Sequence, residues 1–350
     1  MEKKTKKIYY VAELNLPNTS AYSIHVMKMC EAIKKLGFNP SLVTISNHSL
    51  YKTLKNYNID CKFNIISVFK NHMQMNLLMR LIFTFKILIR NFEKESFFIS
   101  RSINFAMIAA AINKKVILEL HHEITGFSKI IYYFLKKLSL IDNLNYIFLH
   151  KNLNKIYKIP KDKFIVLDDA VKIESFKNFR SNKYRNTCVY IGSFFKGKGI
   201  EQILRLAELD HDIKFHIYGE KKNLNYLKIP KNVKILDHIS YSKIPKILSK
   251  YNIALMPYQK KVKGKSSLWL ERYMSPLKMF DYMAARMIIV ASDLAIYKHI
   301  LKNNYNCQLL KVNDDKNWIK KINLIFKNLK KFNKLRNNAK KTAQKYTWDK

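Results

Sequence analysis

The chain has 350 residues, of which 65 are Lys or Arg and 25 are Asp or Glu, so its formal net charge is +40. Hydrophobic residues make up 48% of the chain, which excludes a disordered protein and supplies enough apolar material for two cores. Only nine of the basic residues are Arg, and they are not clustered, so we expect no nucleic-acid partner. The positive charge instead favours anionic ligands or an anionic membrane surface.

The cysteines and the longest apolar stretch bear on the cellular setting. Four cysteines lie far apart without a CxxC pair, which fits neither a zinc site nor a disulfide framework. The N-terminal residues lack the apolar core of a signal peptide, and we expect a cytoplasmic protein. The apolar stretch over residues 77–89 is interrupted by Arg80 and Lys86 and is shorter than the roughly 20 residues of a membrane span. We therefore expect no transmembrane helix.

Short β-branched or aromatic runs alternate with longer amphipathic segments along the first half of the chain, a pattern typical of parallel sheets with crossover helices. The predicted strands are 7–14, 41–46, 63–68, 97–102, 116–121, 146–150 and 164–167. The predicted helices between them are 21–36, 74–91, 104–112 and 128–138. A polar segment, residues 174–186, breaks the pattern and is the expected linker.

A second series of strands and helices follows the linker. Its predicted strands are 188–192, 214–218, 233–236, 253–257, 288–292 and 308–312. Its predicted helices are 200–209, 243–251, 277–286 and 296–303, before a helical tail over 314–350. We predict an α/β protein with two doubly wound, Rossmann-like domains, residues 1–180 and 181–350. Ligands of such sheets bind beyond the carboxyl ends of the strands, so we expect the site in a central cleft between the domains.

The most informative segment, SPLKMFDYMAARMIIVASD, begins at Ser275. Ser275 followed by Pro276 predicts a helix start, because Ser caps free amides and Pro fits the first helical position. The amides of Leu277 and Lys278 then point out of the helix, and the Lys278 ammonium adds positive charge for an anion. Asp281, on the same face, can accept hydrogen bonds from sugar hydroxyls. The alternative is an ordinary cap with an ordinary Lys–Asp surface pair.

The longer segment SPLKMFDYMAARMIIVASDLAIYKHIL resembles the donor-binding signature of family-four glycosyltransferases, whose usual form is close to SPLKLFEYMAAGKPVVASDLPVLREVL. The segment YIGSFFKGKGIEQILRLAE resembles the strand and glycine loop that open their second domain. This resemblance implies a GT-B fold with an acceptor-side first domain and a second domain that binds a nucleotide-sugar donor. It implies that Lys198 meets the donor diphosphate, where Gly192, Gly197 and Gly199 allow close backbone approach.

Other segments extend the resemblance along the chain. HISYSKIPKILSKYNIALMPYQ is similar to the family stretch whose backbone, here near His238 and Ile239, faces the nucleotide base. LNLPNTSAYSIHVMKMCEAIKKLGF resembles the loop and first helix that close over the donor phosphates and the acceptor. That likeness makes Ser20, Ala21 and Tyr22 candidates for acceptor contact. A role in packing the loop is the alternative.

The segment VILELHHE resembles a family segment that ends in ELHD or ELHE. Strand alternation places Glu119 and His121 on one side of the strand and His122 on the other. The resemblance implies that His121 contacts the donor sugar, and a polar strand end is the alternative. Because adjacent strand residues diverge, we do not expect the two histidines to share a metal ion.

These features together predict a retaining glycosyltransferase. The chain would move a sugar from a nucleotide-diphosphate sugar to a glycan or lipid-linked acceptor, in bacterial surface polysaccharide or lipopolysaccharide synthesis. The predicted catalytic residues are His121, Lys198 and Lys278. Because cations and helix amides can stabilise the leaving diphosphate, we expect neither a metal nor a cofactor.

Two other functions remain open. One is a nucleotide-sugar epimerase of the same fold. The other is a non-catalytic GT-B binding protein, which is favoured by Arg286 and Lys172, where the family has Gly and Asp.

Residues 73–92, MQMNLLMRLIFTFKILIRNF, also allow two interpretations. The segment is apolar with interspersed Arg80, Lys86 and Arg90, and it is suited to the surface of an anionic membrane. It equally suits a crossover helix buried against a sheet. We therefore expect a cytoplasmic protein with a peripheral membrane contact as one option.

Overall fold

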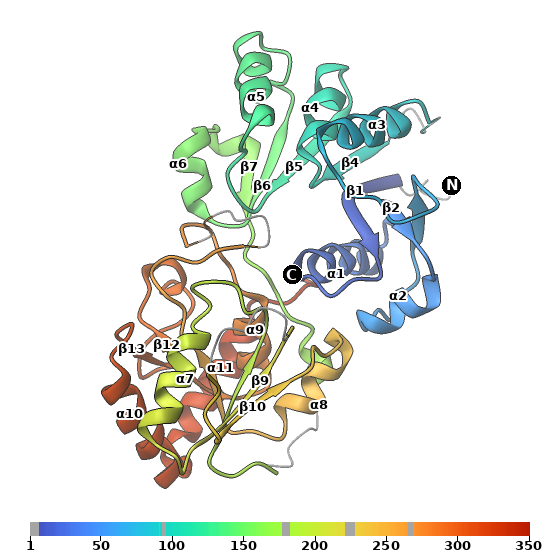
Figure 1. Cartoon of the computed structure of the whole chain (residues 1–350). Helices are drawn as coiled ribbons and strands as arrows, with labels where there is room; N and C mark the ends of the chain where they lie inside the picture. Colours follow the sequence, from blue (N-terminus) through green and yellow to red (C-terminus); the bar gives the residue numbers. More distant parts are fainter. Residues whose placement is uncertain are drawn as a thin grey trace. The chain divides into compact units, whose positions relative to one another are not determined.

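The computed structural model describes residues 7–90, 92, 96–176, 183–220, 228–264, 269 and 271–350 (Figure 1). The chain divides into two compact units, of which the first ends at Asp168 and the second begins at Asp169. The sequence predicts domains that meet at residues 180 and 181, within a linker over 174–186. Residues 177–182 of that segment lie outside the described residues.

The first unit contains a sheet of seven parallel strands in the order β3-β2-β1-β4-β5-β6-β7. The strands are β1 (Lys7–Leu16), β2 (Asn39–Asn47), β3 (Asn64–Ser67), β4 (Phe97–Ser100), β5 (Lys115–Leu120), β6 (Asn145–Phe148) and β7 (Phe164–Val166). The α-helices are α1 (Ala21–Lys35), α2 (Leu50–Asn56), α3 (Leu77–Leu88), α4 (Ile103–Ala111), α5 (Phe127–Lys137) and α6 (Asn154–Tyr157). Central strands read as continuous apolar runs because helices cover both faces of such sheets.

The second unit contains six parallel strands in the order β10-β9-β8-β11-β12-β13. The strands are β8 (Thr187–Ile191), β9 (Lys214–Tyr218), β10 (Val233–Leu236), β11 (Ile253–Met256), β12 (Ile288–Ser292) and β13 (Gln308–Leu310). The α-helices are α7 (Ile200–Leu209), α8 (Ile244–Leu248), α9 (Leu277–Ala284), α10 (Asp315–Lys327) and α11 (Asn333–Ala343). Two separate apolar clusters, one around Phe280 and one around Trp318, give this unit its doubly wound core.

Both sheets reverse their strand order beside their first strand. In the first unit the chain runs outward through β2 and β3 and then returns to place β4 on the other side of β1. In the second unit β11 takes the corresponding place beside β8. The loops at the carboxyl ends of the strands diverge at such a reversal and leave room for ligands. Lys198 follows β8 at this point of the second sheet, and His121 follows β5, one strand beyond the reversal of the first sheet.

One predicted helix is wrong, and two observed α-helices were not predicted. Residues 296–303 do not form an α-helix, and only a short 3-10 turn, Ala295–Tyr297, occurs there. The Tyr297 hydroxyl donates to the Ser292 carbonyl, and Leu301 is fully buried beyond the turn, so packing holds the segment in an irregular path. The unpredicted α-helices are α2 and the four-residue α6.

Candidate functional site

The loop that follows β8 packs directly onto the loop that follows β11. Gly197 and Gly199 have φ angles of +84° and +87°. A Cβ atom on Gly197 would lie 1.9 Å from the Lys261 carbonyl oxygen, and one on Gly199 would lie 2.0 Å from the Pro257 carbonyl oxygen. Both positions therefore require glycine because a neighbouring stretch of protein backbone lies against them. The resemblance implies a different reason, namely close approach of the backbone to a diphosphate.

Lys198 and Lys278 converge on the ring of Tyr258. The Lys198 Nζ lies 4.8 Å from the centroid of this ring, and the Lys278 Nζ lies 5.4 Å from it. Lys278 also places its Nζ 3.5 Å from the centroid of the Tyr190 ring, an attractive cation–π contact. A Cβ atom on Gly192 would lie 2.4 Å from the same Nζ, so this glycine leaves the space that the lysine occupies.

The two ammonium groups lie in surroundings that disfavour positive charge. The Lys278 Nζ is buried and has no hydrogen-bond partner among the described residues. Burial, followed by the charge of Lys198, holds the pKa of Lys278 well below its ordinary value. Burial lowers the pKa of Lys198 to about 8. A buried ammonium without a partner is costly, and an anion placed between the two lysines would relieve that cost.

Helix α9 begins at Leu277, as the predicted range 277–286 has it, but Ser275 does not cap it. Pro276 lies outside the helix with an extended ψ of 117°, and Leu277 is the first helical residue. The Ser275 hydroxyl instead accepts a hydrogen bond of 3.0 Å from the Asp169 amide. The prediction of a serine cap is therefore wrong, whereas Lys278 does occupy the first turn.

Two further predicted donor contacts differ in their surroundings. Asp281 is buried, and its carboxylate accepts a hydrogen bond of 3.1 Å from the Tyr241 hydroxyl. His238, just beyond β10, is exposed. Ile239 packs partly against the core of the second unit. The Tyr241 contact holds Asp281 in place.

In the first unit, Glu119 is the centre of a buried polar cluster at the end of β5. Its carboxylate accepts a hydrogen bond from the Tyr10 hydroxyl and lies 2.5 Å from the His121 Nε2 and 2.6 Å from the His25 Nε2. Arg101 is further away, with its Nε 3.9 Å from the same carboxylate. The sequence pattern placed Glu119 and His121 on one side of the strand, and this is confirmed. Sequence reasoning missed Tyr10, His25 and Arg101.

The hydrogen bond to Glu119 sets the protonation of His121. Burial opposes ionisation of Glu119, but His25 and His121 outweigh it and hold the pKa of this carboxyl well below its ordinary value. Burial, followed by the Arg101 charge, holds the pKa of His121 well below its ordinary value, so its ring is neutral at pH 7. An ionised carboxylate only accepts hydrogen bonds, so the proton of His121 is on Nε2. The lone pair of the ring is therefore on Nδ1.

The His25, Glu119 and His121 side chains are close enough to one another to raise the question of a metal ion. Ligands that share a tetrahedral zinc ion, at bonds of about 2.0–2.1 Å, lie about 3.3 Å from one another. The nitrogen-to-oxygen separations of 2.5 and 2.6 Å are shorter and are those of groups in direct contact. The cluster is therefore arranged as a hydrogen-bonded network.

The N-terminal loop is held by its own contacts. Ser20 caps α1, and its hydroxyl accepts a hydrogen bond of 3.1 Å from the Ser23 amide. The Tyr22 hydroxyl accepts a hydrogen bond of 3.2 Å from the Glu13 amide, while its ring lies 3.9 Å below the Arg101 guanidinium. Ala21 is exposed. The contacts of Ser20 and Tyr22 are those of loop packing.

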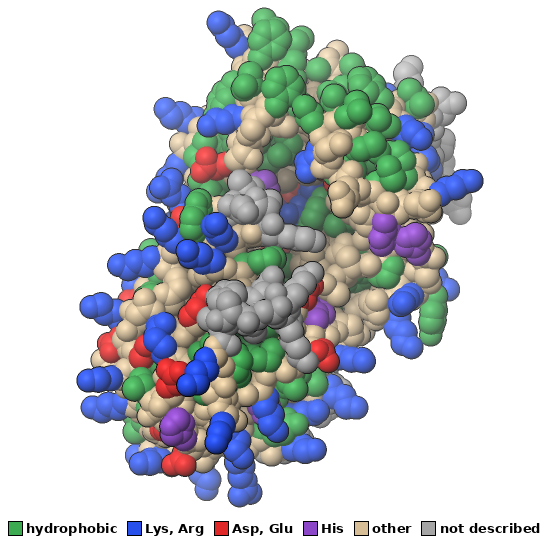
Figure 2. Space-filling view, viewed as in Figure 1, with side chains coloured by type: hydrophobic (Ala, Val, Ile, Leu, Met, Phe, Trp, Pro, Cys, Tyr) green, Lys and Arg blue, Asp and Glu red, His purple; other side chains and the backbone are tan. Residues whose placement is uncertain are grey.

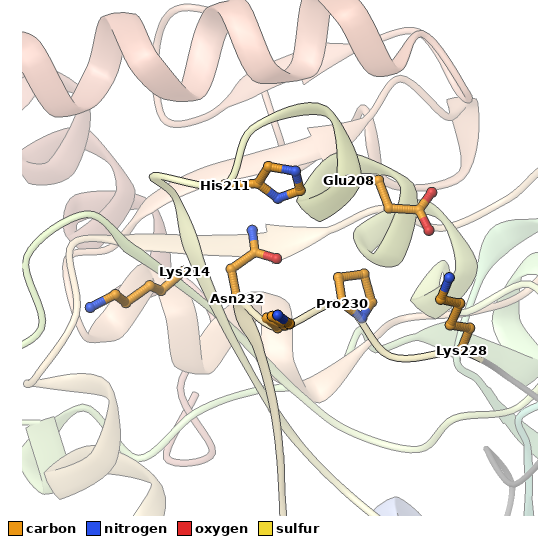
Figure 3. A pocket seen from close by; sticks show the side chains of 7 residues that line it. Glu208, His211, Lys214, Lys228, Pro230 and Asn232 are labelled. Carbon is orange, nitrogen blue, oxygen red and sulfur yellow. The ribbon is translucent and has the colours of Figure 1, made fainter.

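Two other features lie away from these residues. A cavity of about 560 Å³ is lined by Glu208, His211, Lys214, Lys228, Pro230, Lys231 and Asn232 (Figure 3). It lies at the amino ends of β9 and β10, opposite to the candidate residues, and Asn232 there donates to the carbonyls of Ala207, Asp210 and Ile213. That asparagine joins neighbouring loops, which is a structural role.

Arg286 lies just beyond the end of α9 with a φ angle of +55°. Its guanidinium donates a hydrogen bond to Asn337 on α11. Arg286, which stands where the family has Gly, therefore has a hydrogen-bond partner in Asn337. This removes one of the two reasons to favour a non-catalytic protein.

Known proteins share this architecture. Residues 171–342 match the model of the family described as glycosyl transferases group 1. A glycosyltransferase from Rickettsia africae is similar at a TM-score of 0.73 and 14% identity, with 99% of this chain and 95% of that chain covered. A comparison with curated protein sequences finds no match.

Two other solved structures were determined with ligands. HepE of Anabaena, in complex with UDP and glucose, is similar at a TM-score of 0.72 and 12% identity, covering 98% of this chain and 95% of that chain. A variant of S. aureus TarM, in complex with fondaparinux, alpha-GlcNAc-glycerol and UDP, has a TM-score of 0.70 and 14% identity, covering 99% and 98%. The chain therefore has the GT-B fold, and its residues 171–342 match the model of the group 1 glycosyltransferases.

Proposed function

We propose that the protein transfers a sugar from a nucleotide-diphosphate sugar to a glycan or lipid-linked acceptor, with retention of the anomeric configuration. The observation that carries this proposal is the buried Lys278 Nζ beside Lys198, without a hydrogen-bond partner among the described residues. The group 1 match of the second unit and the UDP bound to HepE and TarM support a nucleotide diphosphate as the missing anion.

The proposed chemistry needs a leaving diphosphate that is stabilised as negative charge develops on it. Lys198 and Lys278 supply positive charge, and the first amides of α9 add their dipoles at Leu277. These groups act without a metal ion, so we propose metal-independent transfer. His121 would contact the donor sugar through the Nδ1 atom that its hydrogen bond to Glu119 leaves unprotonated. Asp281 and the backbone near His238 are proposed to contact the nucleoside.

A panel of UDP, GDP, ADP, CDP and their common sugar conjugates tests the proposal by thermal shift. We expect at least one nucleotide diphosphate to raise the unfolding temperature and its sugar conjugate to be hydrolysed slowly to free sugar. EDTA should leave that hydrolysis unchanged. The proposal is wrong if no nucleotide diphosphate or sugar nucleotide stabilises the protein. Stabilisation without hydrolysis or transfer would favour the non-catalytic binding protein.

The stereochemistry and the epimerase alternative are tested with the donor that the panel identifies. NMR of the first product formed distinguishes retention from inversion at the anomeric carbon. Conversion of the donor to an epimer without release of nucleotide diphosphate would favour the epimerase. Proposed surface polysaccharide or lipopolysaccharide synthesis is tested by offering glycan and lipid-linked acceptors with this donor.

A further inference from the structure

Helix α5 exposes an apolar stripe along its whole length. Phe127, Ile130, Phe134 and Leu138 follow one another at helical spacing and are 56%, 66%, 60% and 51% exposed. Tyr132, on the opposite side of the helix, is its only buried side chain. An amphipathic helix normally turns its apolar face to the core, so the outward stripe of α5 needs a partner outside this unit's core.

Helix α3 repeats this arrangement. Leu78, Phe85 and Ile89 lie on one face and are 64%, 55% and 78% exposed, whereas Phe83 and Ile87 on the opposite face are fully buried. The interpretation of residues 73–92 as a crossover helix therefore accounts for one face of α3 only. The buried face makes α3 a crossover helix, and the exposed face is open to a partner.

The two exposed faces belong to neighbouring helices. Helix α4 packs against both α3 and α5. Figure 2 shows hydrophobic side chains gathered at the end of the first unit where these helices lie. We call the exposed apolar residues of α3 and α5 the apolar helix surface. Such an area is larger than the scattered single apolar residues that are normal on a soluble protein.

Helices α3 and α5 carry basic side chains and no acidic ones. Residues 77–92, 103–118 and 124–141 contain no Asp or Glu. They contain exposed basic residues, among them Lys86, Arg90, Lys129 and Lys137. A second copy of the chain that docked on the same surface would place these like charges against one another, whereas anionic headgroups would neutralise them.

We propose that the apolar helix surface binds an anionic lipid bilayer, with the exposed stripes of α3 and α5 at the boundary between headgroups and acyl chains. The short helices suit this position, because an interfacial helix needs one apolar face and flanking Lys or Arg, and no length sufficient to span. None of the described helices is long and apolar enough to cross a membrane. The proposal does not depend on donor binding.

Vesicle flotation with the full chain tests the proposal. The vesicles are phosphatidylcholine alone, or phosphatidylcholine with an equal amount of phosphatidylglycerol, at low salt. We expect the protein to float with the anionic vesicles and to stay behind with the neutral ones. Raising the salt should weaken but not abolish binding, because charge is screened while apolar burial is retained. Failure of the wild-type chain to float with the anionic vesicles would overturn the proposal.

A charge-matched pair of variants locates the contact. Ile130→Asp with Phe134→Asp changes the stripe of α5, and Leu209→Asp with Leu324→Asp makes the same chemical change at exposed positions of the second unit. We expect the first variant to lose at least about tenfold in vesicle partitioning and the second to bind like the wild type. Equal binding by the two variants would overturn the proposal.

Two controls distinguish lost lipid binding from unfolding and from self-association. Circular dichroism and nucleotide-diphosphate binding should be unchanged in the α5 variant, so loss of flotation is not loss of folding or of the donor site. Sedimentation of the wild type then shows whether a second copy of the chain binds this surface. The lipid proposal would be overturned in favour of self-association if the wild type forms a dimer and does not bind vesicles, while the α5 variant is a monomer.

Discussion

At the carboxyl end of the first sheet the charged side chains contact one another, whereas at the same place in the second sheet two lysines have no acidic partner among the described residues. Glu119 is surrounded by His121, His25 and Arg101. Lys278 has two aromatic rings beside its Nζ and a second lysine close by. In the first arrangement the basic groups share one carboxylate, and its hydrogen bond fixes the position of His121. The second is electrostatically incomplete, which is what a site for an anionic ligand requires.

The largest expected effect comes from removing the charge of Glu119 from its network. Glu119→Gln keeps the shape of the side chain but removes its charge, and we expect a loss of about 3 kcal/mol in the free energy of unfolding at neutral pH. The pKa of Glu119 is lowered in the folded state, so its contribution is present above the unfolded pKa of about 4.3 and is lost as the pH falls through the folded value. Urea unfolding of the variant and the wild type at neutral and acidic pH measures the loss of stability and its pH dependence.

Turnover separates this stability effect from the role of His121. In Glu119→Gln we expect kcat to fall about 100-fold with little change in the KM for the donor, because the histidine loses its fixed tautomer. Tyr10→Phe removes one hydrogen bond but keeps the charge, and its kcat should fall only a few-fold. The exposed Glu208→Gln is the control. Equal kcat in Glu119→Gln and wild type would contradict a role for Nδ1 of His121.

The incomplete site is tested by Lys278→Met, which keeps an unbranched side chain but removes the ammonium. We expect nucleotide-diphosphate affinity to fall about 30-fold, because a charge-assisted hydrogen bond contributes about 2 kcal/mol. The unfolding temperature should not fall, since a buried charge without a partner is removed. Calorimetric titration measures the affinity, with the exposed Lys246→Met as control. Lower stability with unchanged affinity would make Lys278 structural and would remove the contrast between the units.

Gly197→Ala tests whether the close packing of the loop that carries Lys198 against the Lys261 backbone matters for stability and nucleotide binding. Gly37 has a φ angle of +87°, close to the +84° of Gly197, but a Cβ atom on Gly37 would meet nothing within 4 Å. Gly37→Ala should therefore cost about 1 kcal/mol from backbone strain alone. In Gly197→Ala the clash with the Lys261 carbonyl adds to this strain, and we expect about 2–3 kcal/mol together with weaker nucleotide binding. If Gly197→Ala and Gly37→Ala lower the free energy of chemical unfolding by the same amount, the loops after β8 and β11 can separate without cost.

The smallest effect is a pH dependence. Because the pKa of Lys198 is about 8, nucleotide-diphosphate affinity should fall by up to about tenfold between pH values of about 7 and 9 as this ammonium loses its proton. Lys198→Arg keeps the charge across this range and should flatten the profile. A wild-type profile as flat as that of the arginine variant would show that Lys198 does not bind the anion.

The sequence predicted most strands because a parallel strand buried on both faces is a continuous apolar run. It also placed Glu119 beside His121, because alternation along a strand is local. It could not predict the rest of the cluster, since Tyr10 and Glu119 are 109 residues apart and meet only through the order of β1, β4 and β5. One local signal was available, because His25 lies one helical turn beyond Tyr22 and hence on the same face of α1.

The two sequence interpretations that failed were both local patterns overridden by distant contacts. Ser275 followed by Pro276 reads as a helix cap, yet the serine hydroxyl accepts from Asp169, more than 100 residues away. Residues 296–303 have helical periodicity, yet Tyr297 and Leu301 are held by the core in an irregular turn. Propensity and capping describe a segment by itself and do not include such partners.

The joined loops of the second unit have a consequence for hydrogen exchange. The Gln259 amide donates to the Gly197 carbonyl and the Lys263 amide donates to the Lys196 carbonyl, each at 2.9 Å. Neither amide can exchange with solvent until the two loops part, so both report one shared opening event. The Lys198 loop becomes ordered when the chain folds, so the conformational entropy of this loop is lost at that stage. Binding of a ligand then costs little further conformational entropy. Such preorganisation allows tight binding from few contacts.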